Sequence, residues 1–198
     1  EILFNTRPIH LKSPQDARKL GIETVYQDLA LVPDMSISRN FYLGRELVKK
    51  TGPFSLLDRT TMDTRATTAL GEIGIHIRNA SEPVVTLSGG ERQSIAIGRA
   101  VHFGSKVLIL DEPTSALSIG ETRKVLGYIK AAKDKNLGVI FITHNIHHVF
   151  EVADRATILS HGQKVGDFKV SDLTQDDVAT MVMGEGVPEH VKGLKIEN

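Results

Sequence analysis

Residues 87–93 read Leu-Ser-Gly-Gly-Glu-Arg-Gln, and residues 107–112 read Val-Leu-Ile-Leu-Asp-Glu. The first stretch places two glycines at the start of an expected helix. Unpaired N–H groups and the positive end of the helix dipole favour an anion there. The second stretch is an apolar run, typical of a strand buried in a parallel sheet, that ends in two carboxylates. Because open α/β sheets bind ligands at the carboxyl ends of their strands, the two stretches predict an α/β fold with a site for phosphate and magnesium.

The stretch of residues 87–93 also has a purely local interpretation. Ser88 and Glu91 have the Ser-x-x-Glu spacing of a capping box, which begins many helices that bind nothing. A capping box alone does not require the glycine pair, whereas close approach of a backbone N–H to an anion does. A third apolar strand is expected over residues 139–143, with His144 at its tip, so another polar group is expected at a strand end.

These three elements, in this order and at this spacing, resemble the ATP-binding cassette (ABC) ATPase family. Residues 87–91 are similar to its signature motif, residues 107–112 to its Walker B strand and residues 142–145 to its switch-histidine segment. The resemblance implies a P-loop NTPase (RecA-like) core, with a mostly parallel sheet and a small helical subdomain at about residues 34–94. It covers residues 1–184 as one ATPase domain, truncated at its N-terminus, and leaves residues 185–198 as a loose tail.

The resemblance also assigns roles to individual residues. Glu112 is expected to polarise the water that attacks the γ-phosphate, and His144 to bond that phosphate. Asp111 would hold Mg²⁺ through its water shell, and Gln27 would meet the same Mg²⁺ through water. The remaining contacts to ATP are assigned to the signature and to the loop after the acidic pair: Leu87, Ser88, Gly89, Gly90, Glu91 and Ser118.

Two departures from the family pattern matter for activity. The family usually has aspartate where this chain has Ser118, which still suits a helix cap but lacks the charge. No G-x-x-x-x-G-K-[ST] phosphate-binding loop occurs in the sequence, so this chain alone is expected to bind ATP weakly and not to hydrolyse it. We therefore expect either a fragment of an active ATPase or a short form without activity.

The run from Val25 to Glu46 resembles the cassettes of bacterial sugar importers of the ribose, fructose and xylose type. The implied partners are a second cassette, which forms a homodimer in the family, transmembrane permease subunits and, indirectly, a substrate-binding protein. The glycine pair is expected to face outward, toward the second cassette. The implied location is the cytoplasmic face of the inner membrane, as a peripheral subunit. The longest apolar runs, residues 107–110 and 139–142, fall short of the ~20 residues that span a bilayer.

Composition and spacing bear on the other function classes. Lys plus Arg and Asp plus Glu each number 24, and the resulting net charge of zero argues against a nucleic-acid partner. Only 60 positions separate Gln27 from Leu87, which leaves no room for the coiled coils of repair ATPases. A translation-factor ATPase and a non-catalytic interaction module remain as alternatives. His144 and His148 have a spacing that a metal accepts, but no third ligand is near in the sequence.

Hydrophobic periodicity and turn residues predict the remaining elements. The cluster Phe41-Tyr42-Leu43 either packs in the core or receives a helix of a transmembrane subunit. The expected strands are residues 1–4, 7–11, 22–26, 106–110, 139–143, 155–159 and 163–168, and the expected helices are residues 13–20, 35–43, 58–73, 88–103, 121–135 and 174–183.

Overall fold

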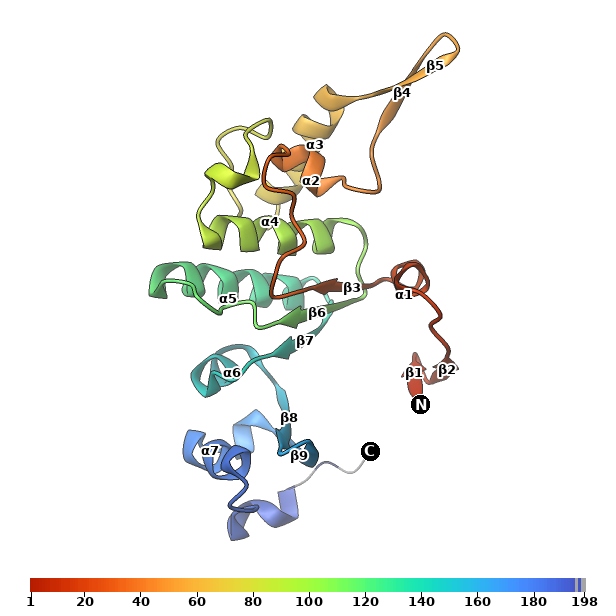
Figure 1. Ribbon diagram of the computed structural model, residues 1–198. Coiled ribbons are helices and arrows are strands. Elements are labelled where there is room, and N and C mark those ends of the chain that lie inside the picture. Colours follow the sequence, from red (N-terminus) through yellow and green to blue (C-terminus); the bar gives the residue numbers. More distant parts are fainter. Residues whose placement is uncertain (195, 197–198) are drawn as a thin grey trace. The chain divides into compact units, whose positions relative to one another are not determined.

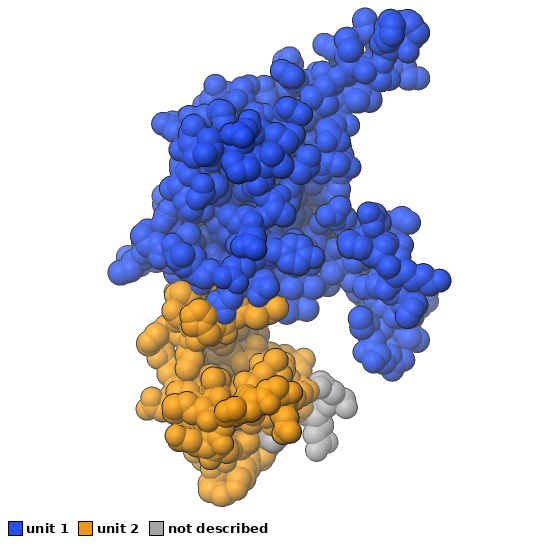
Figure 2. Space-filling model, in the orientation of Figure 1, with its two compact units in different colours: residues 1–140 blue, residues 141–198 orange. Residues whose placement is uncertain are grey.

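The computed structural model describes residues 1–194 and 196. The chain divides into two compact units, residues 1–140 and residues 141–198, which Figure 2 shows in different colours. Of the expected tail, residues 195, 197 and 198 lie outside the described residues. No helix in the described part of the chain is both long and apolar enough to cross a membrane.

A three-stranded sheet forms the centre of the first unit. Its strands are β3 (Ile22–Val25), β6 (Val107–Asp111) and β7 (Gly138–Ile142), in the order β3-β6-β7. β3 and β6 pair in parallel, with Ile22 opposite Val107 and Val25 opposite Leu110. The predicted α/β architecture with a parallel sheet is therefore confirmed. Figure 1 shows α4 (Gly89–His102) and α5 (Ile119–Asp134) running side by side along this sheet.

The strands of this sheet differ in burial. On β6, Leu108 and Leu110 are fully buried, as the apolar run predicts. The prediction that residues 139–143 form a buried strand is wrong, because Ile140 is 51% exposed and Ile142 is 47% exposed. The exposure alternates along β7: Ile140 and Ile142 share one face of the strand and are exposed, whereas Val139 and Phe141 on the other face are partly buried. An apolar sequence alone does not bury a strand when one face of it stays uncovered.

Each remaining helix of the first unit begins where a side chain caps it. Ser13 caps α1 (Pro14–Leu20), Ser36 caps α2 (Ile37–Phe41) and Asp58 caps α3 (Arg59–Gly71). These side-chain oxygens satisfy backbone N–H groups that no helical carbonyl reaches. The predicted helix over residues 35–43 is shorter than expected. α1 ends at Gly21 with φ +84°, a left-handed conformation that glycine adopts without strain.

Two hairpins lie outside the sheet. The expected pair at the N-terminus forms as β1 (Ile2–Phe4) and β2 (Arg7–Ile9). A second hairpin, β4 (Val48–Thr51) with β5 (Phe54–Leu57), was not predicted. Its strands are short and mostly exposed, so they lack the alternation of buried and exposed residues by which a strand is recognised.

The first unit has a core between α2, α3 and α4. Phe41 and Tyr42 are buried in it, whereas Leu43 stays partly exposed. The aromatic pair therefore packs in the core and is not open to a helix of a transmembrane subunit. α3 and α4 approach closely at Gly98, where an added Cβ would lie 2.4 Å from Leu70 Cδ2. The core residues include Ile37, Phe41, Tyr42, Met62, Leu70 and Ile95.

The second unit has its own hydrophobic core. It contains α6 (Ile146–Val152), β8 (Arg155–Ser160), β9 (Gln163–Lys169), α7 (Gln175–Met183) and the 3-10 helix η3 (Glu189–Leu194). The short 3-10 helices η1 (Val84–Thr86) and η2 (Val170–Asp172) connect elements of the first and second units, respectively. Val191 of η3 is fully buried with Phe168 and Met181, so this part of the expected tail is packed.

Candidate functional site

Gln27 and the acidic pair follow adjacent strands at the same edge of the sheet. Val25 of β3 lies opposite Leu110 of β6 in a parallel register. Gln27 follows Val25 after one residue, and Asp111 and Glu112 follow Leu110 directly. Parallel strands end at the same edge, so the register places the glutamine and both carboxylates at the carboxyl edge, where the sequence analysis expected them.

Glu112 has an unusual backbone conformation. Its φ of +47° lies in the left-handed region, which side chains with a Cβ rarely occupy. The turn that follows is closed by a hydrogen bond from the Ser115 N–H to the Glu112 carbonyl, 3.1 Å long. Ala116, in the same loop, also has a positive φ, of +58°. Strained backbone of this kind clusters at functional sites, which supports a role for Glu112 beyond packing.

The oxygen atoms at this edge suit Mg²⁺. The carboxylate of Asp111 and the amide oxygen of Gln27 are hard ligands of the type that Mg²⁺ prefers. Among residues 1–194 and 196, no group of three or more His, Cys, Asp or Glu side chains is arranged to hold a metal ion. Mg²⁺ in nucleotide sites usually takes one or two protein ligands, with phosphate and water completing its shell, so the residues fit the ion. Within the same described residues, no third ligand for a zinc ion joins His144 and His148.

The loop after Gln27 is fixed at its far end by Asn40. This side chain of α2 is fully buried, and its Oδ1 accepts the Val32 N–H at 2.7 Å. Its Nδ2 donates to the carbonyls of Val32, Met35 and Ser36 at 2.9 to 3.2 Å. The sequence analysis did not find Asn40. The available signal was an amide side chain between the apolar residues of a short helix, where a buried polar group must be fully hydrogen-bonded.

Ser88 and Glu91 form the predicted capping box at the start of α4. Ser88 Oγ accepts the Glu91 N–H at 3.3 Å, and a Glu91 carboxylate oxygen accepts the Ser88 N–H at 2.8 Å. Leu87 is buried beneath the turn, Ser88 is exposed and Gly89 is partly exposed. The predicted cap is therefore confirmed.

Gly90 is buried, although the glycine pair was expected to face outward. Its N–H donates to Oε1 of Glu121, 3.1 Å away on α5. Glu121 is held in turn by Ser118, whose N–H and hydroxyl both donate to Oε2, at 3.1 and 2.8 Å. Ser118 caps α5 as predicted, and Ser118 with Glu121 forms a second capping box. From the sequence, Glu121 was expected only at the start of a helix over residues 121–135, with no part in the site.

His144 lies in the second unit, in the connection between β7 and α6. It is exposed, and the next residue, Asn145, caps α6 by accepting the His147 N–H at 3.1 Å. The side chain thus follows a strand end, as the sequence analysis expected. Its convergence with Glu112 stays a prediction.

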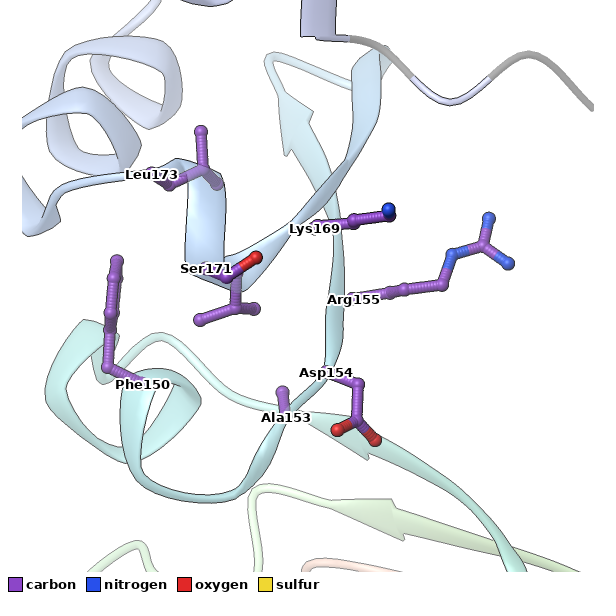
Figure 3. A pocket seen from close by; sticks show the side chains of 8 residues that line it. Phe150, Ala153, Asp154, Arg155, Lys169, Ser171 and Leu173 are labelled. Carbon is purple, nitrogen blue, oxygen red and sulfur yellow. The ribbon is translucent and has the colours of Figure 1, made fainter.

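The second unit also contains a pocket of about 680 Å³, shown in Figure 3. Phe150 and Leu173 line one part of it, and the side chains of Arg155 and Lys169 extend on the other side. None of the predicted site residues lines this pocket. It therefore adds nothing to the phosphate and magnesium site described above.

Comparison with known proteins identifies close relatives. Residues 1–115 match the family model described as ABC transporter. The chain is 45% identical over 193 residues to the fructose import ATP-binding protein of Rhizobium meliloti, covering 95% of this chain and 74% of that protein. It is 40% identical to the xylose/arabinose import ATP-binding protein of Sulfolobus acidocaldarius, covering 92% and 71%. It is 35% identical to a ribose import ATP-binding protein of Escherichia coli O157:H7 and spans 35% of that longer protein.

Solved structures agree on the fold. The ADP conformation of an ATP-binding cassette of an ABC transporter superimposes with a TM-score of 0.73 at 18% identity, covering 96% of this chain and 76% of that one. A dimeric cassette in a post-hydrolysis state, bound to ADP and phosphate, gives 0.65 at 22% identity, covering 85% and 72%. At these identities the likeness establishes the fold alone, and that fold is the expected P-loop NTPase core.

Proposed function

Because the chain belongs to the ABC transporter family of ATP-binding proteins, we propose that it is the ATP-binding subunit of an importer whose cargo is a sugar. The observation that carries this proposal is the 45% identity to a fructose import ATP-binding protein across 95% of the chain. The second and third relatives, named for import of xylose or arabinose and of ribose, also concern sugars. The common cargo class supports a sugar, while the particular sugar differs among them.

In the proposed mechanism, Glu112 polarises the water that attacks the γ-phosphate of ATP. Its carboxylate follows β6 at the edge where Gln27 also lies, so one side chain would act on the water and the other would orient it. Asp111 and Gln27 would hold Mg²⁺ through its water shell. When bound with ATP, the ion neutralises charge on the phosphates. His144 would bond the γ-phosphate as a further positioning group.

The signature turn would act on a second copy of the cassette. Ser88, Gly89 and Gly90 supply a hydroxyl and backbone N–H groups at the positive end of α4, which suits a phosphate. Leu87 and Glu91 hold the turn in shape, and Ser118 begins the neighbouring helix. The dimeric relative of known structure supports such pairing.

The partners in this proposal are a second cassette, transmembrane permease subunits and, through them, a substrate-binding protein. The cassette would sit at the cytoplasmic face of the inner membrane as a peripheral subunit. The exposed loop that contains Gln27 is the proposed contact with the permease. Changes at that loop on ATP binding would be passed to the permease, and the sugar itself would not touch this chain.

The test supplies the phosphate-binding loop that the 198 residues do not contain. In a chimaera, an N-terminal segment of an ABC cassette that carries a G-x-x-x-x-G-K-[ST] loop is joined ahead of Glu1. We expect this chimaera to hydrolyse ATP and Glu112→Gln to slow it by roughly a hundredfold or more, as loss of a general base does. The 198 residues alone are expected to hydrolyse ATP no faster than their own Glu112→Gln variant.

The matched control is Glu72→Gln in the same chimaera. Glu72 is an exposed carboxylate at the end of α3, and its loss is expected to leave the hydrolysis rate unchanged. Equal rates for the chimaera and its Glu112→Gln variant would reject the assigned base. Hydrolysis by the 198 residues alone, above the Glu112→Gln level, would show that they need no added loop.

A further inference from the structure

One carboxylate joins the starts of two helices in the first unit. Oε2 of Glu121 accepts the N–H and the hydroxyl of Ser118, which is the ordinary capping arrangement for α5. Oε1 of the same carboxylate accepts the N–H of Gly90, at the start of α4. The two oxygens therefore have separate tasks, one within its own helix and one on the neighbouring helix.

The absence of a side chain at Gly90 is what permits this contact. A Cβ added there would lie 2.6 Å from Cγ, 2.7 Å from Cβ and 2.8 Å from Oε1 of Glu121. At Gly89 an added Cβ would meet only Leu117 Cδ2, at 3.5 Å, which is an ordinary contact. Of the two signature glycines, the second is thus the one that Glu121 covers.

The Glu121 carboxylate itself occupies the two helix N-termini as an anion. Its pKa is lowered from 4.5 to about 2, first by the Ser118 N–H, then by the Ser118 hydroxyl and the Gly90 N–H, with a smaller effect of Ser88. The carboxylate is therefore ionised at neutral pH. Two helix N-termini, both positive ends of helix dipoles, share this one negative charge.

We propose that Glu121 is an internal competitor for the anion site of the signature turn, and that its carboxylate must leave Gly90 before a phosphate can bind there. This inference rests on the proposed function, in which Gly90 supplies a backbone N–H to the ATP of a second cassette. Rotation of the Glu121 side chain would move Oε1 away from the Gly90 N–H, while Ser118 Oγ would still accept the Glu121 N–H that it accepts now at 3.3 Å. The start of α5 would stay capped, so the switch would cost the fold little.

The consequence is that Glu121 sets the nucleotide concentration at which the signature turn responds. With the carboxylate in place, a phosphate that binds the Gly90 N–H must first displace the hydrogen bond from this N–H to Glu121, so the number of hydrogen bonds does not rise. Without it, the same N–H is open to the phosphate. Removal of the competitor should lower the ATP concentration for half-maximal response by roughly three- to tenfold, the usual net effect of one hydrogen bond.

The test follows the Gly90 amide of the 198-residue chain by nuclear magnetic resonance. In Glu121→Ala and Glu121→Gln, the Gly90 amide proton is expected to move away from the position of a proton bonded to a carboxylate. Glu121→Gln keeps the length of the side chain and a carbonyl oxygen for the Ser118 cap, so it guards against loss of folding. Asp177→Asn is the matched control, because Asp177 fills the same capping role for Thr174 in the other unit.

ATP is then added to each variant in the chimaera that carries the phosphate-binding loop, because the 198 residues alone are expected to bind ATP weakly. We expect the Gly90 amide to respond at a lower ATP concentration in both Glu121 variants than in the unaltered chain, and Asp177→Asn to behave as the unaltered chain does. Equal responses in all four proteins, or no response in any, would overturn the inference. Failure of the proposed function has a different readout, since it is judged by hydrolysis and by Glu112→Gln in the chimaera.

Discussion

The chain has two Ser-x-x-Glu capping boxes, at residues 88–91 and 118–121, and the difference between them shows what a local motif leaves open. Both serines accept the N–H of their glutamate at 3.3 Å. Both glutamates reach back to the N–H of their serine. Within the described part of the chain, Glu91 accepts no hydrogen bond from another helix, whereas Glu121 also accepts the Gly90 N–H of α4. The same Ser-x-x-Glu pattern thus only caps α4 at residues 88–91, whereas at residues 118–121 it caps α5 and also links α5 to α4.

The surroundings explain this difference. α4 and α5 run side by side, and Gly90 presents no side chain toward α5. Glu121 stands at the third position of α5, where its carboxylate can reach the first turn of α4 while still capping its own helix. A capping box is a local hydrogen-bonding device, so its sequence reports the start of a helix and not what lies across from it.

Gly90→Ala should break this arrangement with the largest effect. The new Cβ would lie within 2.8 Å of three Glu121 side-chain atoms, so α4 and α5 must shift or Glu121 must leave. We expect a loss of about 1 to 3 kcal/mol in the free energy of unfolding, as for other overpacked sites, measured by urea denaturation. Gly89→Ala is the control, with an expected change within about 0.5 kcal/mol. Equal losses at both glycines would show that the contact with Glu121 does not limit this position.

Ser118→Ala and Ser88→Ala compare the two caps directly, with a smaller effect. Each variant loses the oxygen that satisfies one backbone N–H, so each should lower the free energy of unfolding by about 1 kcal/mol. Ser118→Ala should be the more costly of the two, because the Ser118 hydroxyl also donates to Glu121 and steadies the link to Gly90. Thermal unfolding of both variants at neutral pH measures the difference. A greater loss in Ser88→Ala would contradict the assigned roles.

The smallest expected effect is the dependence on pH, because the Glu121 carboxylate is accessible to water and screened by it. Its pKa in the folded chain is about 2, below its value of 4.5 without these partners. A depressed pKa stabilises the fold above pH 4.5, and this stabilisation is lost as the pH falls from 4.5 toward 2. The difference in melting temperature between the unaltered chain and Glu121→Gln should therefore be constant above pH 5 and shrink below it. A difference that stays constant down to pH 3 would assign the effect to another group.

Much of the site was predictable because its residues mark the ends of elements. Gln27 and the acidic pair follow apolar runs, and the parallel register of β3 and β6 brings them to one edge. Ser88 and Ser118 precede helical periodicity and cap it. Patterns of this kind extend over a few residues, and backbone hydrogen bonding acts over the same range.

Other features of the fold were not predictable, for different physical reasons. Asn40 stands among apolar residues of a short helix, and only the path of the preceding loop gives its amide four hydrogen bonds. The strands β4 and β5 are almost entirely exposed, so their sequences lack the alternation of apolar and polar residues that indicates a strand. Val191 appeared to be part of a loose tail, yet it packs against the core of the second unit.

By itself the sequence determined the order of the elements, the helix starts and the family resemblance, all of which depend on neighbours along the chain. The tertiary structure decided which apolar side chains are buried, since Leu108 lies on a covered face of its strand and Ile140 lies on an exposed face of β7. It also decided that Gly90 is covered by a carboxylate 31 positions away. Such contacts depend on how closely two elements approach, and that distance is set by the packing of side chains between them rather than by any local pattern.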